Sequence, residues 1–384
     1  MKRNPIAKFL SFGIAALLIT TFSGAQDPKF AELGDLRLES GEWIRDCRVG
    51  YRTFGELSAD KSNAIVFLIG ASGTTEQAAE FVGPGKLLDS SRHYVILIDP
   101  LSNGVSSSPS NSRLQPRMKF PPITIGDMVN SQHELLTRVL RLEHVKAVIG
   151  QSMGGVQTFQ WMVSYPDFMD KAVPIVATPR PTSYDLIFYG TVIEAIKRDL
   201  AWNNGDYTTE PAARLRAGIA ALILETPQAI NQQVPREQVE QALEQFGPLA
   251  DANDQIRQYE AGLAFDLSRP FGNSLERAAA AVKAKVLVIV ASQDHAANPA
   301  PALEFAKLLG AQTLVLDSEC GHVITVCEAE KIARRVGEFL NGPPRPEFDT
   351  GLGKMAHFLH IPRWTYPLGI SKKRGLADLE GGVL

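Results

Sequence analysis

The sequence has 384 residues, of which 45% are hydrophobic and 21% are charged. This balance is typical of a soluble globular protein with enough apolar material for a substantial core. The formal net charge of −3 gives no basis for expecting a nucleic acid or an acidic membrane surface as a partner. The length permits one large domain or two small ones.

Residues 1–25 are predicted to be a signal peptide. An apolar stretch over 9–22 is preceded by basic residues and followed by the small residues 23–25; the basic residues are Lys2, Arg3 and Lys8. The stretch is shorter than the ~20 residues that a membrane-spanning helix needs, and no cysteine lies near the cleavage site. We therefore expect a processed protein that is periplasmic or secreted and free of the membrane.

Residues 26–179 and 281–341 are expected to form an α/β core. Two strands around a turn at Ser40-Gly41 are predicted within 36–57. Continuous apolar runs, which are typical of strands buried on both faces, follow at 64–71, 94–101, 145–150, 172–178, 285–292 and 313–317.

Helical patterns lie between these runs. One begins with a capping box of Thr124 and Asp127 and places four apolar residues on one face: Met128, Leu135, Leu136 and Val139. Another covers 301–311 and ends at Gly310. The alternation of strands and helices predicts a mostly parallel sheet with helices on both faces.

The alternation stops over residues 180–280, where the sequence is helical throughout. About a hundred residues between two strands are too many for a loop. We expect them to form a helical cap over the strand ends, where α/β proteins bind their ligands. A C-terminal extension rich in Pro and Gly follows over 342–384, and its role is not evident from the sequence.

Ser152 lies in the segment GQSMG (150–154), which matches the pattern G-x-S-x-G. The segment follows a predicted strand and precedes a predicted helix, which is the context in which this pattern presents a nucleophile on a tight turn. Glycines on either side allow the backbone to approach its neighbours closely. Ser152 is therefore predicted to be a catalytic nucleophile.

A serine nucleophile needs a base to take its proton and an acid to orient that base. Asp294 and His322 each follow a predicted strand, in the chain order expected for this arrangement. Asp317 is the alternative acid, but it lies only five residues before His322. His295 adjoins Asp294 and comes one strand too early, so we expect it to be an exposed loop residue. The predicted triad is Ser152, Asp294 and His322.

Acyl transfer also needs donors for the oxyanion that develops on the substrate. The backbone N–H of Met153, directly after the nucleophile, is expected to supply one donor. The other is expected from the loop after the strand at 64–71, at Ala71 or Ser72.

The sequence shows no sign of a cofactor or metal site. VGPGK (82–86) lacks the glycine and the hydroxyl residue that a phosphate-binding loop requires, and no metal-ligand spacing is present. Three cysteines are too few for a disulfide framework. A Cys320–Cys327 bridge and buried thiols both fit the sequence.

The sequence resembles the homoserine O-acetyltransferase-like branch of the α/β-hydrolases from about Leu36 to Leu340. The resemblance is carried by YRTFGEL, VGPGKLLDSSRHYVILIDPLSNGVSSSPSNS, FPPITIGDMVNSQHELL, VIGQSMGGVQTFQWMVSYPD and NNGDY. It implies an α/β-hydrolase fold with an inserted cap, and the triad already named. It further implies either transfer of an acetyl group from acetyl-CoA to a hydroxyl or, as in related esterases, ester hydrolysis.

Three departures argue against homoserine as the acceptor. Ile193 stands where the transferases carry an arginine that grips the substrate carboxylate, and an apolar side chain cannot make that contact. Lys197 or Arg198 could substitute, although surface positions are expected for both. Ile69 replaces the family's histidine before the oxyanion loop, and GHVITV and DHAANP differ from the usual segments around His322 and Asp294.

We therefore expect an exported esterase that removes short acyl groups, acetyl foremost, from a small alcohol, because acetyl-CoA is a cytoplasmic metabolite. The alternatives are an O-acetyltransferase that acts on homoserine or serine, and a non-catalytic binding protein on the same fold. The expected partner is a small-molecule ester. Dimerisation through the cap, which family members show, is compatible with the apolar run 217–224, as is burial of that run within one chain.

Overall fold

The structure is a computed structural model that describes residues 27–245, 247 and 250–342. The predicted signal peptide and, apart from its first residue, the predicted C-terminal extension lie outside the described residues. No helix in these described ranges combines the length and the hydropathy that a membrane crossing requires.

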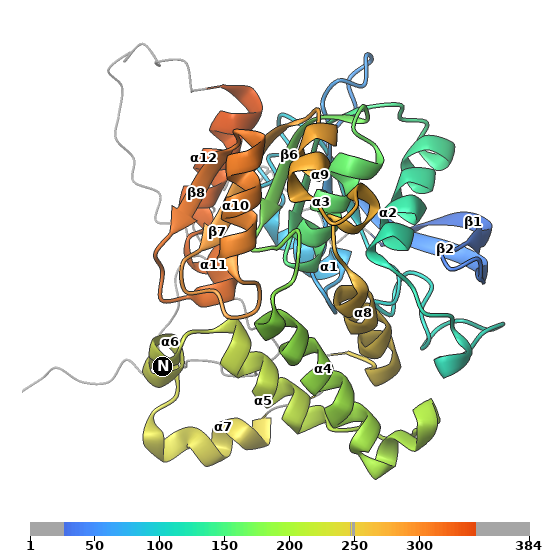
Figure 1. Cartoon of the computed structure of the whole chain (residues 1–384), viewed down its shortest axis with the longest axis vertical. Coiled ribbons are helices and arrows are strands. Elements are labelled where there is room, and N and C mark those ends of the chain that lie inside the picture. The colour runs from blue at the N-terminus through green and yellow to red at the C-terminus, as the bar shows by residue number, and fades with distance from the viewer. Residues whose placement is uncertain (1–26, 246, 248–249, 343–384) are drawn as a thin grey trace, which may run out of the picture.

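An eight-stranded sheet runs through the molecule in the order β1-β2-β4-β3-β5-β6-β7-β8 (Figure 1). Strands β3 to β8 pair in parallel, and β1 and β2 extend one edge in antiparallel pairing. The strands are β1 (Lys29–Arg37), β2 (Trp43–Phe54), β3 (Ala64–Leu68), β4 (Tyr94–Ile98), β5 (Val145–Gln151), β6 (Met169–Ile175), β7 (Lys285–Ala291) and β8 (Gln312–Leu316). The predicted α/β architecture is confirmed.

The β1–β2 hairpin begins earlier than the sequence indicated. Its turn lies where predicted, with Gly41 at φ +89° and its N–H donating to Leu38 O over 2.9 Å. Strand β1, however, starts at Lys29, and its pairing with β2 shifts register on both sides of Gly34. This irregularity interrupts the alternation of apolar and polar residues, which is why the sequence does not predict the part of β1 that precedes Leu36.

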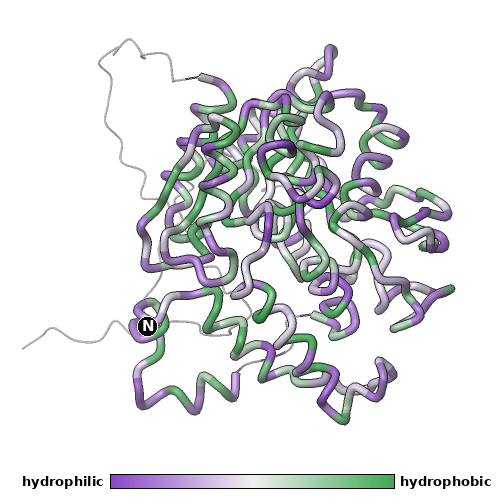
Figure 2. The backbone as a smooth tube through the Cα atoms, viewed as in Figure 1, coloured by the Kyte–Doolittle hydropathy of each residue, from purple (hydrophilic) through white to green (hydrophobic). Residues whose placement is uncertain are grey.

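The central strands are buried on both faces, as their continuous apolar runs predict. Along β3, Ile65 and Phe67 enter one core and Val66 and Leu68 enter the other. Helices α2 (Ile125–Glu134), α3 (Met153–Ser164), α9 (Leu275–Ala281) and α10 (Pro299–Leu309) contribute to one core. Helices α1 (Thr75–Ala78), α11 (Ile324–Cys327) and α12 (Ala329–Asn341) contribute to the other. Figure 2 shows the resulting concentration of hydrophobic segments inside the molecule.

Helix α2 begins with the predicted capping box of Thr124 and Asp127, but its predicted apolar face is wrong at one position. After Glu134 the helix continues as a π-helical segment, Leu135–Val139. A π turn is wider than an α turn and rotates the residues that follow it. Leu135 is fully buried, whereas Val139 is 39% exposed. Helix α10 ends at Gly310, as predicted.

The segment between β6 and β7 is helical, as expected. It contains α4 (Ser183–Arg198), α5 (Ala213–Leu224), α6 (Pro227–Gln233), α7 (Val239–Gln245) and α8 (Ala252–Ala264), which lie together on one side of the sheet (Figure 1). Helices α4 and α8 share a small core that includes Phe188, Ile193 and Tyr259. The next helix, α9, packs against α3 and α10 of the core. The predicted first and last residues of the cap, 180 and 280, stay a prediction.

Candidate active site

Ser152 lies on a strained turn between β5 and α3. Its backbone angles are φ +56° and ψ −123°, a conformation that non-glycine residues rarely adopt and that costs roughly 1–3 kcal/mol. Two hydrogen bonds hold the turn: Ser152 N–H donates to Ile175 O (2.9 Å), and Val156 N–H donates to Ser152 O (3.0 Å). The predicted strand–turn–helix context of the serine is present.

The glycines beside the serine are required by close backbone approach. A Cβ atom on Gly154 would lie 2.0 Å from Leu68 O, and a Cβ atom on Gly150 would lie 2.1 Å from Gly154 O. Both distances are far below van der Waals contact with backbone atoms that cannot move aside. The turn therefore fits against β3 because these two positions carry no side chain.

In the structure, Ser152, His322 and Asp294 form a hydrogen-bonded triad. Ser152 Oγ lies 2.8 Å from His322 Nε2, and His322 Nδ1 lies 2.8 Å from Asp294 Oδ2. A carboxylate only accepts, so Nδ1 carries the proton and Nε2 is free to accept the serine proton. The side chains of His322 and Asp294 are 4% and 1% exposed.

Each of the three residues follows a different parallel strand, since they come after β5, β7 and β8. Asp294 is fixed further by the backbone N–H groups of Ala296 (2.8 Å) and Ala297 (2.9 Å), which donate to its Oδ1. The alternative acid, Asp317, accepts instead from Ser292 Oγ, 2.8 Å away.

Within the described chain, the His295 side chain makes no hydrogen bond or ion pair with Ser152, His322 or Asp294. It is half-buried beside Asp294 rather than exposed, which corrects the expectation of an exposed loop residue.

The candidate oxyanion donors flank the serine. Met153 is the first residue of α3, and the first N–H groups of a helix have no partner within the helix. Across the site, Gly73 N–H donates to Gly70 O (3.2 Å) and closes a turn that contains Ala71 and Ser72. A Cβ atom on Gly70 would lie 3.2 Å from Ser152 Cβ, so this turn is packed directly against the nucleophile.

The N–H groups of Ala71 and Ser72 are not equivalent. Ser72 N–H donates to Gln258 Oε1 on α8 over 2.8 Å, and the buried Ser72 hydroxyl has no hydrogen-bond partner among the described residues. Because the Ser72 N–H is occupied, Ala71 N–H is the better candidate for the second oxyanion donor.

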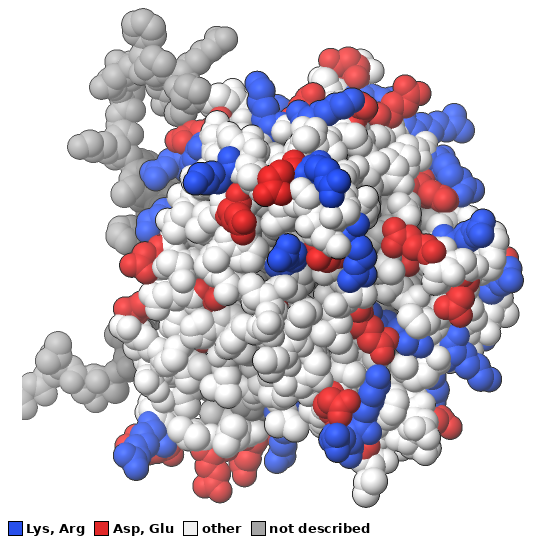
Figure 3. Space-filling view, viewed as in Figure 1, with Lys and Arg blue, Asp and Glu red and all other residues white. Residues whose placement is uncertain are grey.

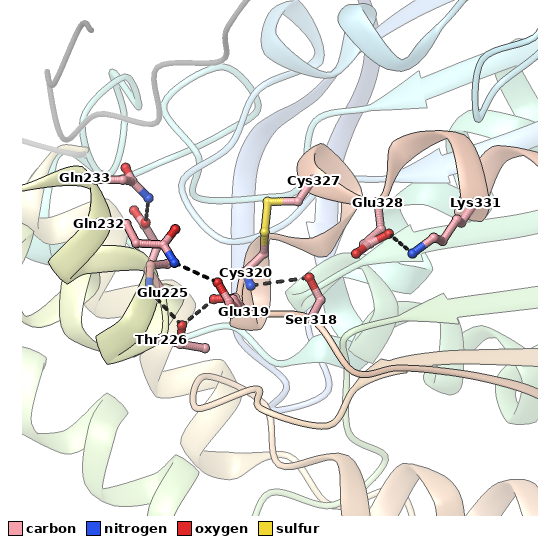
Figure 4. The surroundings of a disulfide bond; sticks show 11 residues. Glu225, Thr226, Gln232, Gln233, Ser318, Glu319, Cys320, Cys327, Glu328 and Lys331 are labelled. Carbon is pink, nitrogen blue, oxygen red and sulfur yellow. Dashed lines mark hydrogen bonds and ion pairs between the residues drawn. A yellow bond between two sulfur atoms is a disulfide. The ribbon is translucent and has the colours of Figure 1, made fainter.

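A disulfide closes the loop that carries His322. Cys320 and Cys327 are bonded, so of the two readings that the sequence allowed, the bridge is the one present. Figure 4 shows that the neighbouring Glu319 also meets α6 of the cap. Glu319 accepts from Thr226 Oγ through its backbone oxygen and from Gln232 Nε2 (2.9 Å) through its carboxylate. The remaining thiol, Cys47, is buried, and burial raises its pKa to about 12.

The serine opens into a cavity of about 200 Å³ between core and cap. None of the described residues that line it is Lys, Arg, Asp or Glu. Its apolar wall includes Ile69, Phe81, Phe188, Tyr189, Leu224 and Phe265. Within the described chain, no group of three His, Cys, Asp or Glu side chains is arranged to hold a metal ion.

The cap residues singled out in the sequence do not form a cationic site. Ile193 is 5% exposed and packs in the cap core. Lys197 Nζ lies 3.3 Å from Glu260 Oε1, and Arg198 Nε lies 2.9 Å from Glu194 Oε2. Neither basic residue lines the cavity.

Sequence reasoning missed the contribution of α8. Gln255, Gln258, Tyr259 and Gly262 all line the cavity, and they recur at the spacing of one helical face. That spacing was the available signal, but polar residues on a helical face normally indicate a solvated surface. Here Gln258 is 1% exposed, and burial raises the pKa of Tyr259 to about 12.

Comparison with known proteins agrees with this geometry. A family model described as the alpha/beta hydrolase fold matches residues 63–326. An ethyl acetate hydrolase of Pseudomonas veronii is 33% identical over 68% of this chain and 79% of its own length. A homoserine O-acetyltransferase of Geotalea daltonii is 30% identical over 80% of this chain and 95% of its own.

Among solved structures, an acetylester hydrolase from Corynebacterium glutamicum superposes with a TM-score of 0.76 and 30% identity, over 82% of this chain and 95% of its own. These relatives support an enzyme of acyl transfer or ester hydrolysis. The chain therefore belongs to the α/β-hydrolase family, in the homoserine O-acetyltransferase-like branch that also includes esterases.

Proposed function

We propose that this enzyme hydrolyses short-chain acyl esters, acetyl esters foremost, of a small uncharged alcohol. The observation that carries the proposal is the hydrogen-bonded line from Asp294 through His322 to Ser152, which ends in an apolar cavity of about 200 Å³. An apolar cavity of roughly 150 Å³ holds benzene. The available space therefore suits a small ester.

The geometry accounts for both halves of the reaction. Ser152 Oγ attacks the ester carbonyl carbon while His322 Nε2 takes the hydroxyl proton, and the N–H groups of Met153 and Ala71 stabilise the oxyanion. The C–O bond to the alcohol then breaks, and His322 returns the proton to the departing oxygen. Water attacks the acyl-serine and gives a proton to His322. As the second tetrahedral species collapses, its bond to Ser152 Oγ breaks and His322 gives its proton to that oxygen, which releases the carboxylic acid and restores both Ser152 and His322.

The character of the cavity favours hydrolysis over transfer to homoserine. Homoserine carries a carboxylate and an ammonium group, and burying either without a charged partner costs several kcal/mol. The cavity wall offers no such partner among the described residues. Ile193, at the position of the transferase arginine, is apolar and packs away from the cavity.

The second candidate function is an O-acetyltransferase that uses acetyl-CoA. It is favoured by the identity with a homoserine O-acetyltransferase over 95% of that protein's length. This candidate requires that the acceptor bind without the arginine contact and that the enzyme meet acetyl-CoA.

We also propose that the enzyme is exported. The predicted signal peptide motivates this proposal, and the Cys320–Cys327 bridge supports it, because disulfides persist in oxidising compartments and are rare in the cytosol. Detection of the processed chain in a periplasmic or culture fraction would test it, and an unprocessed cytoplasmic protein would contradict it.

A homodimer through the cap is a further proposal. Tyr184 and Ile187 of α4 are 51% and 68% exposed, and Leu215 and Leu222 of α5 are 56% and 66% exposed. In Figure 3 charged side chains are sparse over α5 and the first half of α4, whereas the end of α4 carries Glu194, Lys197 and Arg198. In sedimentation experiments, Leu222→Glu should shift a dimer toward monomer. The control is Leu114→Glu, at a 60% exposed position outside the cap, which should not.

The function is tested with the protein from Gln26 onward and ethyl acetate, by titration of the acid released. Parallel reactions contain excess homoserine, with or without acetyl-CoA, and the control is Ser152→Ala. Hydrolysis that requires Ser152 and is unchanged by homoserine is the expected result. Formation of acetyl-homoserine would overturn the esterase proposal in favour of the transferase.

A further inference from the structure

Gln258 connects the cap to the turn that carries the second oxyanion donor. Its side-chain oxygen accepts from Ser72 N–H (2.8 Å), and its side-chain nitrogen donates to Leu101 O (3.3 Å). The residue is 1% exposed, so both hydrogen bonds are shielded from water. Hydrogen bonds in such surroundings are strong, and a buried group that loses its partner costs about 1–3 kcal/mol.

The turn that Gln258 holds is conformationally strained. Gly73 N–H donates to Gly70 O, which makes Ala71 and Ser72 the central residues of a four-residue turn. Ser72 has φ +59°, a value that suits glycine at this position of a turn but is unfavourable for serine. The Ser72 hydroxyl has no hydrogen-bond partner among the described residues, so it does not offset the strain. The bond from Gln258 therefore selects the orientation of the Ala71–Ser72 peptide.

That orientation matters because the turn touches the nucleophile. Gly70 approaches Ser152 so closely that an added Cβ atom would lie 3.2 Å from Ser152 Cβ. Ala71 follows directly, and its N–H is the one that Gln258 leaves open. A shift of the turn by a fraction of an ångström would move this donor away from the position of the oxyanion, where the optimal distance is about 2.7–3.1 Å.

We propose that Gln258 is a positioning residue for the oxyanion site: its carboxamide, reaching in from the cap, holds the Gly70–Gly73 turn so that Ala71 N–H points at the substrate carbonyl oxygen. This inference rests on the proposed ester chemistry at Ser152. The oxyanion site then depends on both core and cap, because Met153 belongs to the core and the hydrogen bond that holds Ser72, next to Ala71, comes from α8.

Helix α8 is suited to this role because it is fastened to the core on the same side. Asp254 accepts from Ser110 N–H (2.9 Å), and Arg257 donates through Nε to Phe120 O (3.0 Å). These contacts limit movement of the helix that carries Gln258. The core therefore helps to set the position of the Gln258 carboxamide that bonds Ser72 N–H.

The test compares two buried glutamines. Gln258→Met keeps the approximate volume and removes both hydrogen bonds. The matched control is Gln132→Met: Gln132 is 1% exposed and its side chain is also hydrogen-bonded at both ends, to Gln157 and to Trp161 Nε1 (2.8 Å), but it does not line the cavity. Gln258→Met should lower kcat about 10- to 100-fold, with KM within about threefold of the wild type, since the lost stabilisation belongs to the transition state. Gln132→Met should leave kcat within about threefold.

Two further readouts separate positioning from simple destabilisation. A trifluoromethyl ketone, which forms a tetrahedral oxyanion on the serine, should bind Gln258→Met more weakly by the factor lost in kcat. Ala71→Pro removes the donor N–H directly, and a turn of this kind accepts proline at that position. Adding Gln258→Met to Ala71→Pro should then lower kcat by less than about threefold, because the two changes remove the same interaction.

The outcomes are distinct. If the wild type does not hydrolyse esters, the proposed function fails. If the wild type is active but Gln258→Met retains kcat, raises KM alone, or multiplies the effect of Ala71→Pro, this inference fails. Should Gln258→Met not fold, amide hydrogen exchange in the wild type decides: the Ser72 amide proton should exchange slowly, and rapid exchange would overturn this inference.

Discussion

Removal of the disulfide should lower the stability of the enzyme while leaving the chemistry at Ser152 largely intact. The change is Cys320→Ser combined with Cys327→Ser. The bridge joins residues seven apart and closes a loop around His322. For a closed loop of about eight residues, the chain-entropy relation gives about 2.5 kcal/mol of stabilisation.

Activity at 25 °C should stay within about threefold, because other contacts keep the loop in place. His322 remains bonded to Asp294, and Glu319 remains bonded to Thr226 and Gln232 of the cap. The temperature at which activity is lost should fall by a few degrees, as expected for a change of this size in a large domain.

Urea unfolding of the oxidised wild type and of the double variant measures the free energy of unfolding, and ester hydrolysis at rising temperature measures the activity. A reducing agent should lower the unfolding free energy of the wild type by the same amount as the double substitution, and it should have no effect on the variant. An unfolding free energy that differs by less than about 0.5 kcal/mol would refute the reasoning. Loss of activity on reduction of the variant would do so as well.

Three further substitutions test the site and its support. Asp294→Asn should lower kcat for ester hydrolysis roughly 10⁴-fold with little change in KM, because His322 loses the acceptor that fixes its tautomer. Gly154→Ala should lower the urea-unfolding free energy by at least about 3 kcal/mol, since its Cβ atom would lie 2.0 Å from Leu68 O. Burial raises the pKa of Asp254 to about 7, above the ~3.9 of an unfolded chain, so the folded state binds this proton more tightly. Wild-type stability should therefore fall by up to about 1.4 kcal/mol per pH unit from about pH 4 to pH 7, and Asp254→Asn should lack this slope in urea unfolding.

The parts of the fold that the sequence predicted share a local signal. The parallel strands are apolar without interruption because both of their faces are buried, and Ser152 is marked by glycines that close packing requires. His322 and Asp294 could be selected because the residues after parallel strands converge at one edge of the sheet. In each case, neighbours in the sequence carry the information.

The parts that the sequence did not predict depend on distant partners. Gln258 acquires its role from Ser72, which is 186 residues away, and no local pattern records that contact. The pairing of Cys320 with Cys327 stayed open because spacing alone does not decide between a bridge and two thiols. Val139 was misplaced because a π-helical segment changes the rotation per residue that a regular helix would have.

The backbone at Ser152 places activity and stability under opposing selection. Glycine would adopt its conformation without steric cost, so an inactive glycine variant would gain the roughly 1–3 kcal/mol of strain, less the roughly 0.5–1 kcal/mol that the greater freedom of glycine in the unfolded chain costs. Native proteins are stable by only about 5–15 kcal/mol. The lineage that keeps this nucleophile must therefore maintain surplus stability elsewhere in the fold, and the size of that surplus limits how many destabilising substitutions it can accumulate while its substrate range evolves.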